Sequence, residues 1–401
     1  MENRDDFDEA PTLVRSPCRR TAKPDGIEGQ LLLGKYRILR CLAKGGMGVI
    51  YLARVEGAAG FIKPVVVKRV LPSFANAPEY IESFIHEAQV LAALHDPGIA
   101  NVIDFEKTES GYLMVLEYVH GFEVKEWTNY LAQKGERIPC DIAVMILISV
   151  LTTLQHVHGL RREKTRLPEI VHRDISPANI MIDAEGRIKL VDFGIALFLP
   201  TTPLEYDANE EIPFMGKLPY AAPELLRGRR PSAASDIFAC GVTLHELLTG
   251  RNEFVGHDTS ETIHNVMTHH LSPIGAYCRH APEGIDNIIG KATQKKADER
   301  FQSAGAFAEA LRSILATQEY VLLNKLAGMV QRDFHSEEMI LYLDTPSLEE
   351  RDMAWQTSSF LPESVLNDPY VTAHYRSNEK IESFEWETLP TSLQDDSGKI
   401  K

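Results

Sequence analysis

Hydrophobic and polar residues alternate in short runs through the first third of the chain, which is the pattern of β-strands. These runs lie at residues 36–55, 64–70 and 112–119. Between them, residues 78–94 place apolar side chains at the spacing of an amphipathic helix. Farther along, residues 143–158 and 235–248 are long apolar runs typical of buried helices. We therefore expect a strand-rich part with one prominent helix, followed by a larger helical part.

Three short apolar runs in the middle of the chain predict strands separated by loops. They are residues 170–171, 180–182 and 188–191. The loops carry Asp174, Asn179 and Asp192, which two short strands can bring together. One carboxylate of such a cluster can accept the proton of an attacking hydroxyl group. A second carboxylate and an amide oxygen suit a hard cation such as Mg²⁺, so the cluster predicts a catalytic site that uses magnesium.

A glycine cluster follows the first predicted strand and comprises Gly45, Gly46 and Gly48. Backbone N–H groups of such a turn can approach phosphates without obstruction by side chains. The next predicted strand carries Lys68 among valines, and a lone charge in an apolar strand is costly unless it is paired. Glu87, beside the apolar stripe of the following helix, is the candidate partner. For the glycine cluster, the alternative is a purely structural turn. For Lys68, the alternative is an edge strand from which the lysine reaches solvent.

The central motif resembles the catalytic core of protein kinases, whose pattern is H-R-D-x-x-x-x-N followed by D-F-G. The matching residues are His172, Arg173, Asp174 and Asn179, then Asp192, Phe193 and Gly194. Further matches to that family's lower scaffold are Glu224 of an A-P-E motif, Asp236 and Arg300. They extend the resemblance over about residues 31–318. Small-molecule phosphotransferases share the catalytic loop but lack this scaffold, so the resemblance disfavours them.

The resemblance implies an α+β, bilobal protein-kinase-like fold. A small antiparallel β-rich N-lobe with one key helix would span about residues 31–119, and a larger, mainly helical C-lobe about residues 120–318. Residues 1–30 mix charges with prolines, and we expect a disordered leader. Residues 319–401 are expected to form an acidic tail that is partly helical and then largely disordered.

In function, the chain resembles bacterial eukaryotic-like serine/threonine protein kinases, which implies transfer of the ATP γ-phosphoryl group to protein hydroxyls in bacterial intracellular signalling. Asp174 would position and deprotonate the hydroxyl group. Lys68 and Glu87 would fix the α/β-phosphates. Asn179 and Asp192 would bind Mg²⁺. The implied partners are protein substrates, with the chain itself among them, and the oligomeric state stays open.

The resemblance also assigns the contacts with ATP to the glycine loop, the hinge and the walls of the cleft. These residues are Ala43, Lys44, Gly45, Gly46, Met47, Gly48, Ile50, Val66, Lys68, Glu117, Val119 and Met181. Ala43 departs from the family pattern, because it replaces the first glycine of the loop.

Two other departures lie at the catalytic loop and at the end of the activation segment. Ser176 stands where serine/threonine kinases have a lysine two residues after the catalytic aspartate, and Lys217 stands where they have a threonine. We hypothesise that Lys217 returns the positive charge that Ser176 removes and so contributes to catalysis. The alternative is an exposed lysine without a role. Because both marker residues differ, serine/threonine rather than tyrosine specificity rests on analogy.

The departures also leave open a different class of protein, a pseudokinase scaffold that binds nucleotide or partners without catalysis. Against this interpretation, the polar set required for catalysis is complete, and a scaffold has no reason to retain it. The set comprises Lys68, Glu87, Asp174, Asn179 and Asp192.

Composition and charge narrow the environment of the protein. The net charge of −15 argues against a nucleic-acid binder, which needs a basic face. The five cysteines are scattered without a C-x-x-C pair, so we expect neither a zinc site nor a disulfide framework. The N-terminus has no apolar signal segment, and runs such as residues 143–150 fall short of the roughly 20 residues of a membrane span. We therefore expect a cytoplasmic protein without a nucleic-acid or membrane partner.

Overall fold

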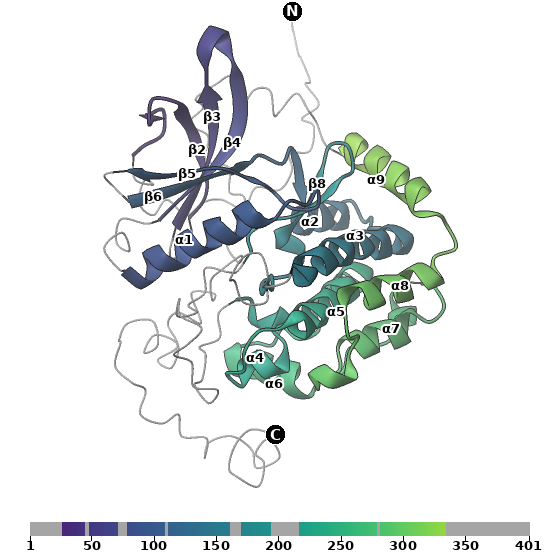
Figure 1. The fold of residues 1–401 in the computed structure, drawn as a ribbon. Helices are drawn as coiled ribbons and strands as arrows, with labels where there is room; N and C mark the ends of the chain where they lie inside the picture. Colours follow the sequence, from purple (N-terminus) through teal and green to yellow (C-terminus); the bar gives the residue numbers. More distant parts are fainter. Residues whose placement is uncertain are drawn as a thin grey trace, which may run out of the picture.

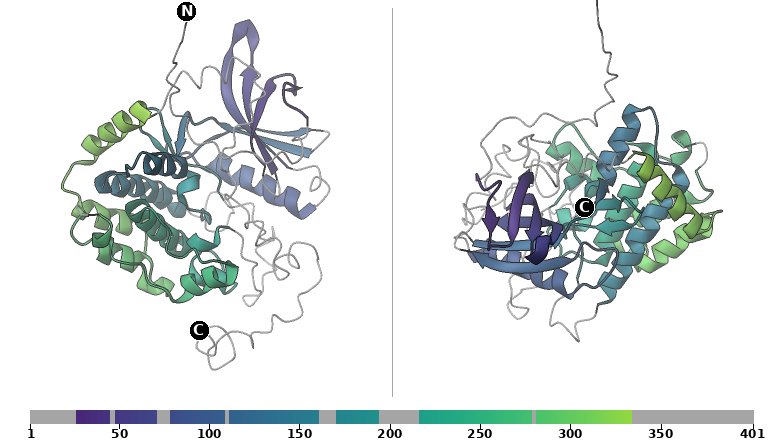
Figure 2. Two further views of the ribbon diagram at one scale, coloured as in Figure 1. Left: turned by 180° about the vertical axis from the view of Figure 1, so that it is seen from behind. Right: turned by 90° about the horizontal axis from the view of Figure 1, so that it is seen from above.

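The structure, a computed structural model, describes residues 26–44, 48–70, 78–108, 111–160, 170–193, 216–278 and 281–333. In Figure 1 a twisted sheet with one long helix lies above a larger group of helices. Figure 2 shows the same two parts from behind and from above. The bilobal α+β fold expected from the sequence is confirmed.

The N-lobe is built on a six-stranded sheet with the order β1-β2-β3-β4-β6-β5, and every neighbouring pair is antiparallel. Its strands are β1 (Leu31–Leu32), β2 (Tyr36–Lys44), β3 (Gly48–Glu56), β4 (Ile62–Val70), β5 (Val102–Thr108) and β6 (Gly111–Glu117). A short 3-10 helix, η1 (Ala58–Gly60), joins β3 to β4. The long helix is α1 (Pro78–Ala93), and it packs beside β5, where the rings of Phe84 and Phe105 are 5.8 Å apart.

Alternation along β4 decides which side chains enter the N-lobe core. Val65 and Val67 have 0% exposure and belong to one hydrophobic cluster. Because successive side chains of a strand point to opposite faces, Val66 and Lys68 lie on the other face. Val66 packs there, together with Ile50, against a second, smaller cluster of Leu39, Leu42 and Leu52. The strand therefore presents an apolar residue and a lysine on the same side, as the nucleotide assignment requires.

The C-lobe is mainly helical. Its α-helices are α2 (Val124–Gln133), α3 (Cys140–Gly159), α4 (Pro223–Leu226), α5 (Ala233–Thr249), α6 (Thr259–Thr268), α7 (Ile285–Ala292), α8 (Ala304–Ile314) and α9 (Glu319–Asp333). Short 3-10 helices connect them: η2 (Pro177–Asn179), η4 (Leu218–Tyr220), η5 (Ile274–Ala276) and η6 (Ala297–Glu299). α3 is the central element and packs against α5, α8 and α9.

The length of α3 exceeds the apolar run recognised in the sequence. It has 20 residues and a mean hydropathy of 1.7, so by length and composition alone it is able to cross a membrane. However, 67% of this apolar stretch is buried inside the fold. Its apolar surface is therefore covered by neighbouring helices, as is usual for a core helix.

A second, three-stranded sheet lies where the two lobes meet, with the order β7-β8-β9 and antiparallel pairs. The strands are β7 (Gly121–Glu123), β8 (Ile180–Asp183) and β9 (Ile188–Leu190). Gly121 approaches β8 so closely that a Cβ atom would lie 1.9 Å from the carbonyl oxygen of Ile182. Only glycine fits there, and the close contact holds the end of the hinge against β8, the strand that follows the catalytic loop.

α9 follows the point at which the sequence analysis ended the C-lobe, residue 318. Its residues Leu322, Leu326 and Val330 are at most 1% exposed and join the main hydrophobic core. Spacing of four residues places these side chains on one face of the helix. The part of the predicted tail beyond Asp333, and the leader before residue 26, lie outside the described residues.

One covalent bond differs from expectation. The scattered cysteines were expected to form no disulfide framework, and the structure places one bond among them, which joins Cys140 at the start of α3 to Cys278 after η5, 138 residues apart. Cysteines this far apart in the sequence carry no pairing signal, because only the packing of the C-lobe brings the two positions together. Cys240 is a buried free thiol.

Candidate active site

A buried ion pair connects the N-lobe sheet to α1. Lys68 Nζ donates to Glu87 Oε1 at 2.7 Å, and it lies 3.6 Å from Asp192 Oδ1. Glu87 is 1% exposed. Burial by itself would lower the pKa of Lys68, but the two carboxylates outweigh it and the pKa is raised, so the ammonium group stays charged. The partner that the sequence proposed for Lys68 is therefore in contact with it.

Asp236 on α5 holds the backbone of the catalytic loop. Its carboxylate accepts the N–H groups of His172 at 2.8 Å and Arg173 at 2.9 Å. Arg173 has a φ of 72°, a conformation that is costly outside glycine, and these two bonds help to stabilise it. His158 Nε2 completes the arrangement at 2.8 Å from the same carboxylate. The loop therefore presents Asp174 from a fixed backbone.

His172 contributes packing rather than charge. Burial lowers its pKa to about 4, so the imidazole is neutral near pH 7. Its ring lies 4.3 Å from that of Phe193, centroid to centroid. The contact joins the catalytic loop to the start of the activation segment. Gly194 and the following residues to 215 lie outside the described part of the chain.

The carboxylate of Asp174 is oriented by Asn179, five residues later in the same loop. Asn179 Nδ2 donates to both the backbone oxygen and Oδ2 of Asp174, each at 2.7 Å. Burial raises the pKa of Asp174 to about 6, against the opposing effect of Lys217 and the hydrogen bond from Asn179. The group is thus mainly ionised at neutral pH and still able to accept a proton.

The residues predicted to bind magnesium fit a hard cation. Asn179 Oδ1 is buried and has no hydrogen-bond partner among the described residues. This oxygen is therefore available as a ligand for a cation. Asp192, with a φ of 50°, follows β9, the strand that pairs with β8. No group of three or more His, Cys, Asp or Glu side chains within the described ranges forms an alternative metal site. An amide oxygen and a carboxylate are ligands that Mg²⁺ accepts.

Those residues predicted to contact ATP that the structure describes lie on β2, β3, β4, β6 and β8 and on the hinge. Ile50 on β3 pairs with Ala43 on β2 and with Lys68 on β4, so these positions are neighbours in the sheet. Met181 comes from β8 below, paired with Glu123 of β7. Gly48 lies against the backbone of β4, where a Cβ atom would be 2.8 Å from the carbonyl oxygen of Arg69. Lys44 ends β2, while Gly45, Gly46 and Met47 lie outside the described residues.

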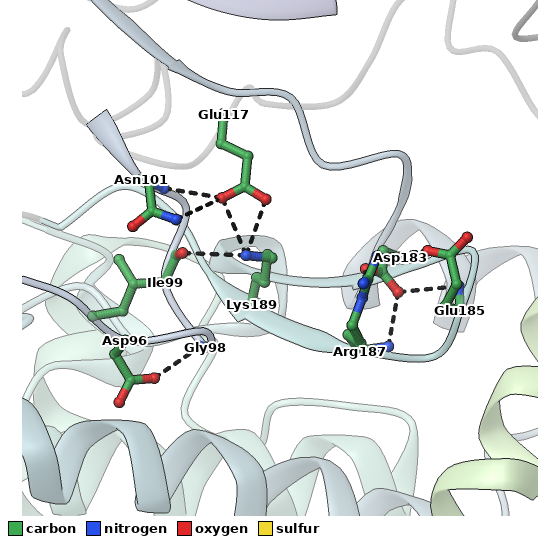
Figure 3. Close-up of polar contacts among 9 residues, drawn as sticks. All are labelled: Asp96, Gly98, Ile99, Asn101, Glu117, Asp183, Glu185, Arg187 and Lys189. Atoms are coloured by element: carbon green, nitrogen blue, oxygen red, sulfur yellow. Dashed lines mark hydrogen bonds and ion pairs between the residues drawn. The ribbon is translucent and has the colours of Figure 1, made fainter. Parts of the chain in front are cut away.

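The side chain of the hinge residue Glu117 is engaged by Lys189 and Asn101 (Figure 3). Its carboxylate pairs with Lys189 Nζ at 3.0 Å and accepts the side-chain amide of Asn101 at 3.1 Å. Burial would raise the pKa of Glu117, but Lys189 and Asn101 outweigh it and the pKa is lowered. Any contact of Glu117 with a nucleotide therefore has to come from its backbone. Val119, two residues on, is 5% exposed.

Lys217 is brought next to the catalytic aspartate by the fold. It precedes η4, and its Nζ donates to Ser176 Oγ at 2.7 Å and lies 3.2 Å from Asp174 Oδ2. Its side chain is 6% exposed. The alternative of an exposed lysine does not describe this geometry. A groove beside the ammonium group is lined by Asp174, Lys217, Tyr220 and Leu225, among others.

The lower scaffold residues also meet as the resemblance implies. Arg300 Nη1 and Nη2 each donate to a different oxygen of Glu224 at 2.7 Å, and the arginine side chain is fully buried. Such a two-point arrangement fixes orientation as well as distance. It ties the A-P-E segment to the loop before α8.

Two polar residues at the site were missed in the sequence. Glu123 ends β7 with both carboxylate oxygens buried and without a hydrogen-bond partner in the described part of the chain. Burial, reinforced by Glu126, raises its pKa well above the usual range, while Lys217 opposes the shift. Lys189 on β9 is a lone lysine between apolar residues, which is the same pattern that identified Lys68. It was missed because its partner Glu117 was assigned only to the nucleotide.

Comparison with known proteins agrees with this geometry. A family model described as the protein kinase domain matches residues 36–317. The tyrosine-protein kinase MasK of Myxococcus xanthus is 33% identical over 283 residues, which cover 71% of this chain and 43% of MasK. The serine/threonine-protein kinase PrkC of Bacillus subtilis is 34% identical over 280 residues, covering 69% and 40%. PknA of Mycobacterium tuberculosis is 32% identical over 294 residues, covering 72% and 63%. The chain thus spans less than two thirds of these curated relatives.

A solved structure resembles this one in fold. The crystal structure of the Mycobacterium tuberculosis PknI kinase domain aligns with a TM-score of 0.52 at 23% sequence identity. The alignment covers 72% of this chain and 100% of that domain. At this level of identity the likeness concerns the fold alone.

Proposed function

Because this chain belongs to the protein kinase family, we propose that it transfers the γ-phosphoryl group of ATP to serine or threonine hydroxyls of proteins. The observation that carries the proposal is the ion pair of Lys68 and Glu87, formed within 3.6 Å of Asp192. The charge of Asp192 also contributes to the raised pKa of Asp174. Such a set has no evident use in a scaffold that performs no chemistry.

Binding and orientation of ATP fall to the N-lobe. Lys68, held by Glu87, offers a fixed positive charge for phosphate oxygens. The apolar side chains of Ile50 and Val66 provide a surface for a purine ring on the same face of the sheet. Met181 supplies the opposite wall from β8. The hinge at Glu117 and Val119 offers backbone groups for the base edge.

The catalytic loop would position and deprotonate the acceptor hydroxyl. Asp174 would accept the proton of the hydroxyl group as its oxygen attacks the γ-phosphorus. The hydrogen bonds from Asn179 keep the carboxylate in one orientation for this step. Asn179 Oδ1 and the Asp192 carboxylate would hold Mg²⁺, which neutralises phosphate charge when bound.

Serine/threonine specificity follows the relatives PrkC and PknA, which are named as serine/threonine kinases. MasK is named as a tyrosine kinase, so the acceptor residue has to be measured. Phosphoamino-acid analysis of the products distinguishes the two. Phosphotyrosine as the main product would contradict this part of the proposal and leave the kinase activity standing.

The test of the activity is transfer of labelled phosphate from ATP and Mg²⁺, both to the protein itself and to a generic basic protein. Wild type and Asp174→Asn are compared at equal ATP occupancy, since the substitution removes the proton acceptor but retains the shape. Signal in the wild type that is lost in the variant supports the proposal. Measurable ATP binding without transfer by the wild type would instead favour the pseudokinase scaffold.

A further inference from the structure

The cation next to Asp174 does not come from the catalytic loop. Lys217 lies 43 residues farther along the chain, and its Nζ is 3.2 Å from Asp174 Oδ2. The ammonium group is enclosed, with 6% of the side chain exposed. It therefore lies beside the carboxylate that an attacking hydroxyl group has to reach.

Ser176 makes room for this arrangement and fixes it. Its hydroxyl oxygen accepts a 2.7 Å hydrogen bond from Lys217 Nζ, and the residue is 1% exposed. A lysine at position 176 would bring a second ammonium group into the same enclosed space, and two like charges there would repel. The short side chain at position 176 and the long one at position 217 therefore depend on each other: the cation has moved from the first position to the second. Ser176 is the positioning residue and Lys217 carries the charge.

Lys217 belongs to what we call the closing segment, residues 216–226, which comprises η4 and α4. This segment contributes Tyr220, Ala221 and Leu225 to the small groove beside Asp174, whose other walls are the catalytic loop and α5. The same short stretch of chain therefore packs against the catalytic loop and places the cation beside Asp174.

The closing segment is held by contacts at some distance from Asp174. Tyr220 donates its hydroxyl to Glu246 on α5, and Asn252 Nδ2 donates to the backbone oxygen of Pro219 at 3.4 Å. Glu224 is held by Arg300. Ala222 and Leu225 pack in a cluster with Phe238 and Phe254 of the C-lobe. When these contacts loosen, the position of Lys217 is lost together with the groove wall.

We propose that Lys217 is a catalytic residue whose charge is present at Asp174 only while the closing segment is packed, so that the packing of this segment and the catalytic charge are coupled. The inference rests on the proposed function and deepens it. As the hydroxyl oxygen bonds to the γ-phosphorus, its proton passes to Asp174 and the bond to the ADP oxygen breaks. Lys217 keeps its proton throughout and stabilises the negative charge of the transferred group.

The catalytic part is tested with Lys217→Met, Lys217→Arg and the exchange Ser176→Lys/Lys217→Thr. Loss of the cation in Lys217→Met is expected to lower kcat about a hundredfold, with ATP affinity unchanged. Lys217→Arg retains a cation, and the exchange moves the cation to the catalytic loop. Each is expected to have a kcat at least about tenfold higher than that of Lys217→Met. A Lys217→Met enzyme with more than half of the wild-type kcat overturns the assignment.

The coupling is tested with Tyr220→Phe, which removes the hydroxyl that binds Glu246 but keeps the ring that lines the groove. In the wild-type background kcat is expected to fall about tenfold through misplacement of Lys217. In the exchange background, and in Lys217→Met, the same substitution is expected to change kcat less than about twofold. Equal losses in all three backgrounds show that Tyr220 acts only on substrate, and refute the coupling.

Two measurements separate these outcomes from misfolding and from failure of the proposed function. Thermal unfolding and ATP binding are recorded for every variant, and a variant enters the comparison when it is folded at the assay temperature and binds ATP as the wild type does. The Lys217→Met and Tyr220→Phe cycle remains decisive if the exchange does not fold. Absence of transfer by the wild type refutes the proposed function, whereas transfer that survives in Lys217→Met refutes the present inference alone.

Discussion

Trp127 on α2 donates its indole N–H to the carboxylate of Asp333, the last residue of α9, at a distance of 3.0 Å. The bond joins positions 206 residues apart, and both side chains are buried. Because the protein kinase family model ends at residue 317, α9 is an addition to it in this chain. The helix nevertheless covers α3 and completes the core (Figure 1).

We therefore predict that α9 is needed for a stable catalytic domain. Leu326→Ala removes a side chain of 0% exposure and should cost about 2–5 kcal/mol of unfolding free energy. Leu323→Ala, one turn away at 38% exposure, is the matched control and should cost about 0.5 kcal/mol or less. Chemical denaturation measures both. Equal effects of the two substitutions would show that α9 is not packed as described.

The Arg300–Glu224 pair gives a second prediction about stability. Arg300 is fully buried and also donates to the backbone oxygens of Gln294 and Ala234, so lysine cannot replace its planar fork. Arg300→Lys should lower the unfolding free energy by about 3–5 kcal/mol.

Arg312→Lys is the comparison for that measurement. Arg312 pairs with Glu309 and Glu319 at 30% exposure, so its replacement should cost about 1 kcal/mol or less. A wild-type melting temperature in Arg300→Lys would be inconsistent with a buried two-point contact.

The hinge network of Figure 3 leads to a third prediction. Lys189→Met removes the cation that neutralises Glu117 and should destabilise the protein by about 1–3 kcal/mol, because the carboxylate is left with only Asn101. Lys296→Met breaks the exposed pair with Glu299 and should have almost no effect. Thermal unfolding of the two variants decides the point, and a harmless Lys189→Met would show that the hinge does not depend on this pair.

The raised pKa of Asp174 predicts the acidic limb of the pH–rate profile. Burial raises this pKa to about 6, so the carboxyl group is protonated as the pH falls through that value and can no longer accept the hydroxyl proton. The rate at limiting substrate should therefore fall about tenfold per pH unit below pH 6 and level off above pH 7. ATP binding measured over the same range is the control, and a profile that stays flat to pH 5 would contradict the assignment.

Much of the site was predictable because its parts are local. Asp174 and Asn179 are five residues apart in one loop, so their contact follows from the sequence motif. Lys68 in a run of valines required a partner, and the helical period of the next segment placed Glu87 on the correct face. The bilobal fold was implied by the resemblance to protein kinases, and the strand and helix periods along the chain agree with it.

The remaining contacts join segments whose separation carries no periodic signal. The sequence by itself determined that Lys217 and Ser176 depart together from the family pattern, but only the packing of the closing segment against the catalytic loop decided that they touch. The same holds for Glu117 with Lys189, Trp127 with Asp333 and Cys140 with Cys278. Periodicity determines which face of an element is buried, whereas the packing of distant elements decides which residue of another element meets that face.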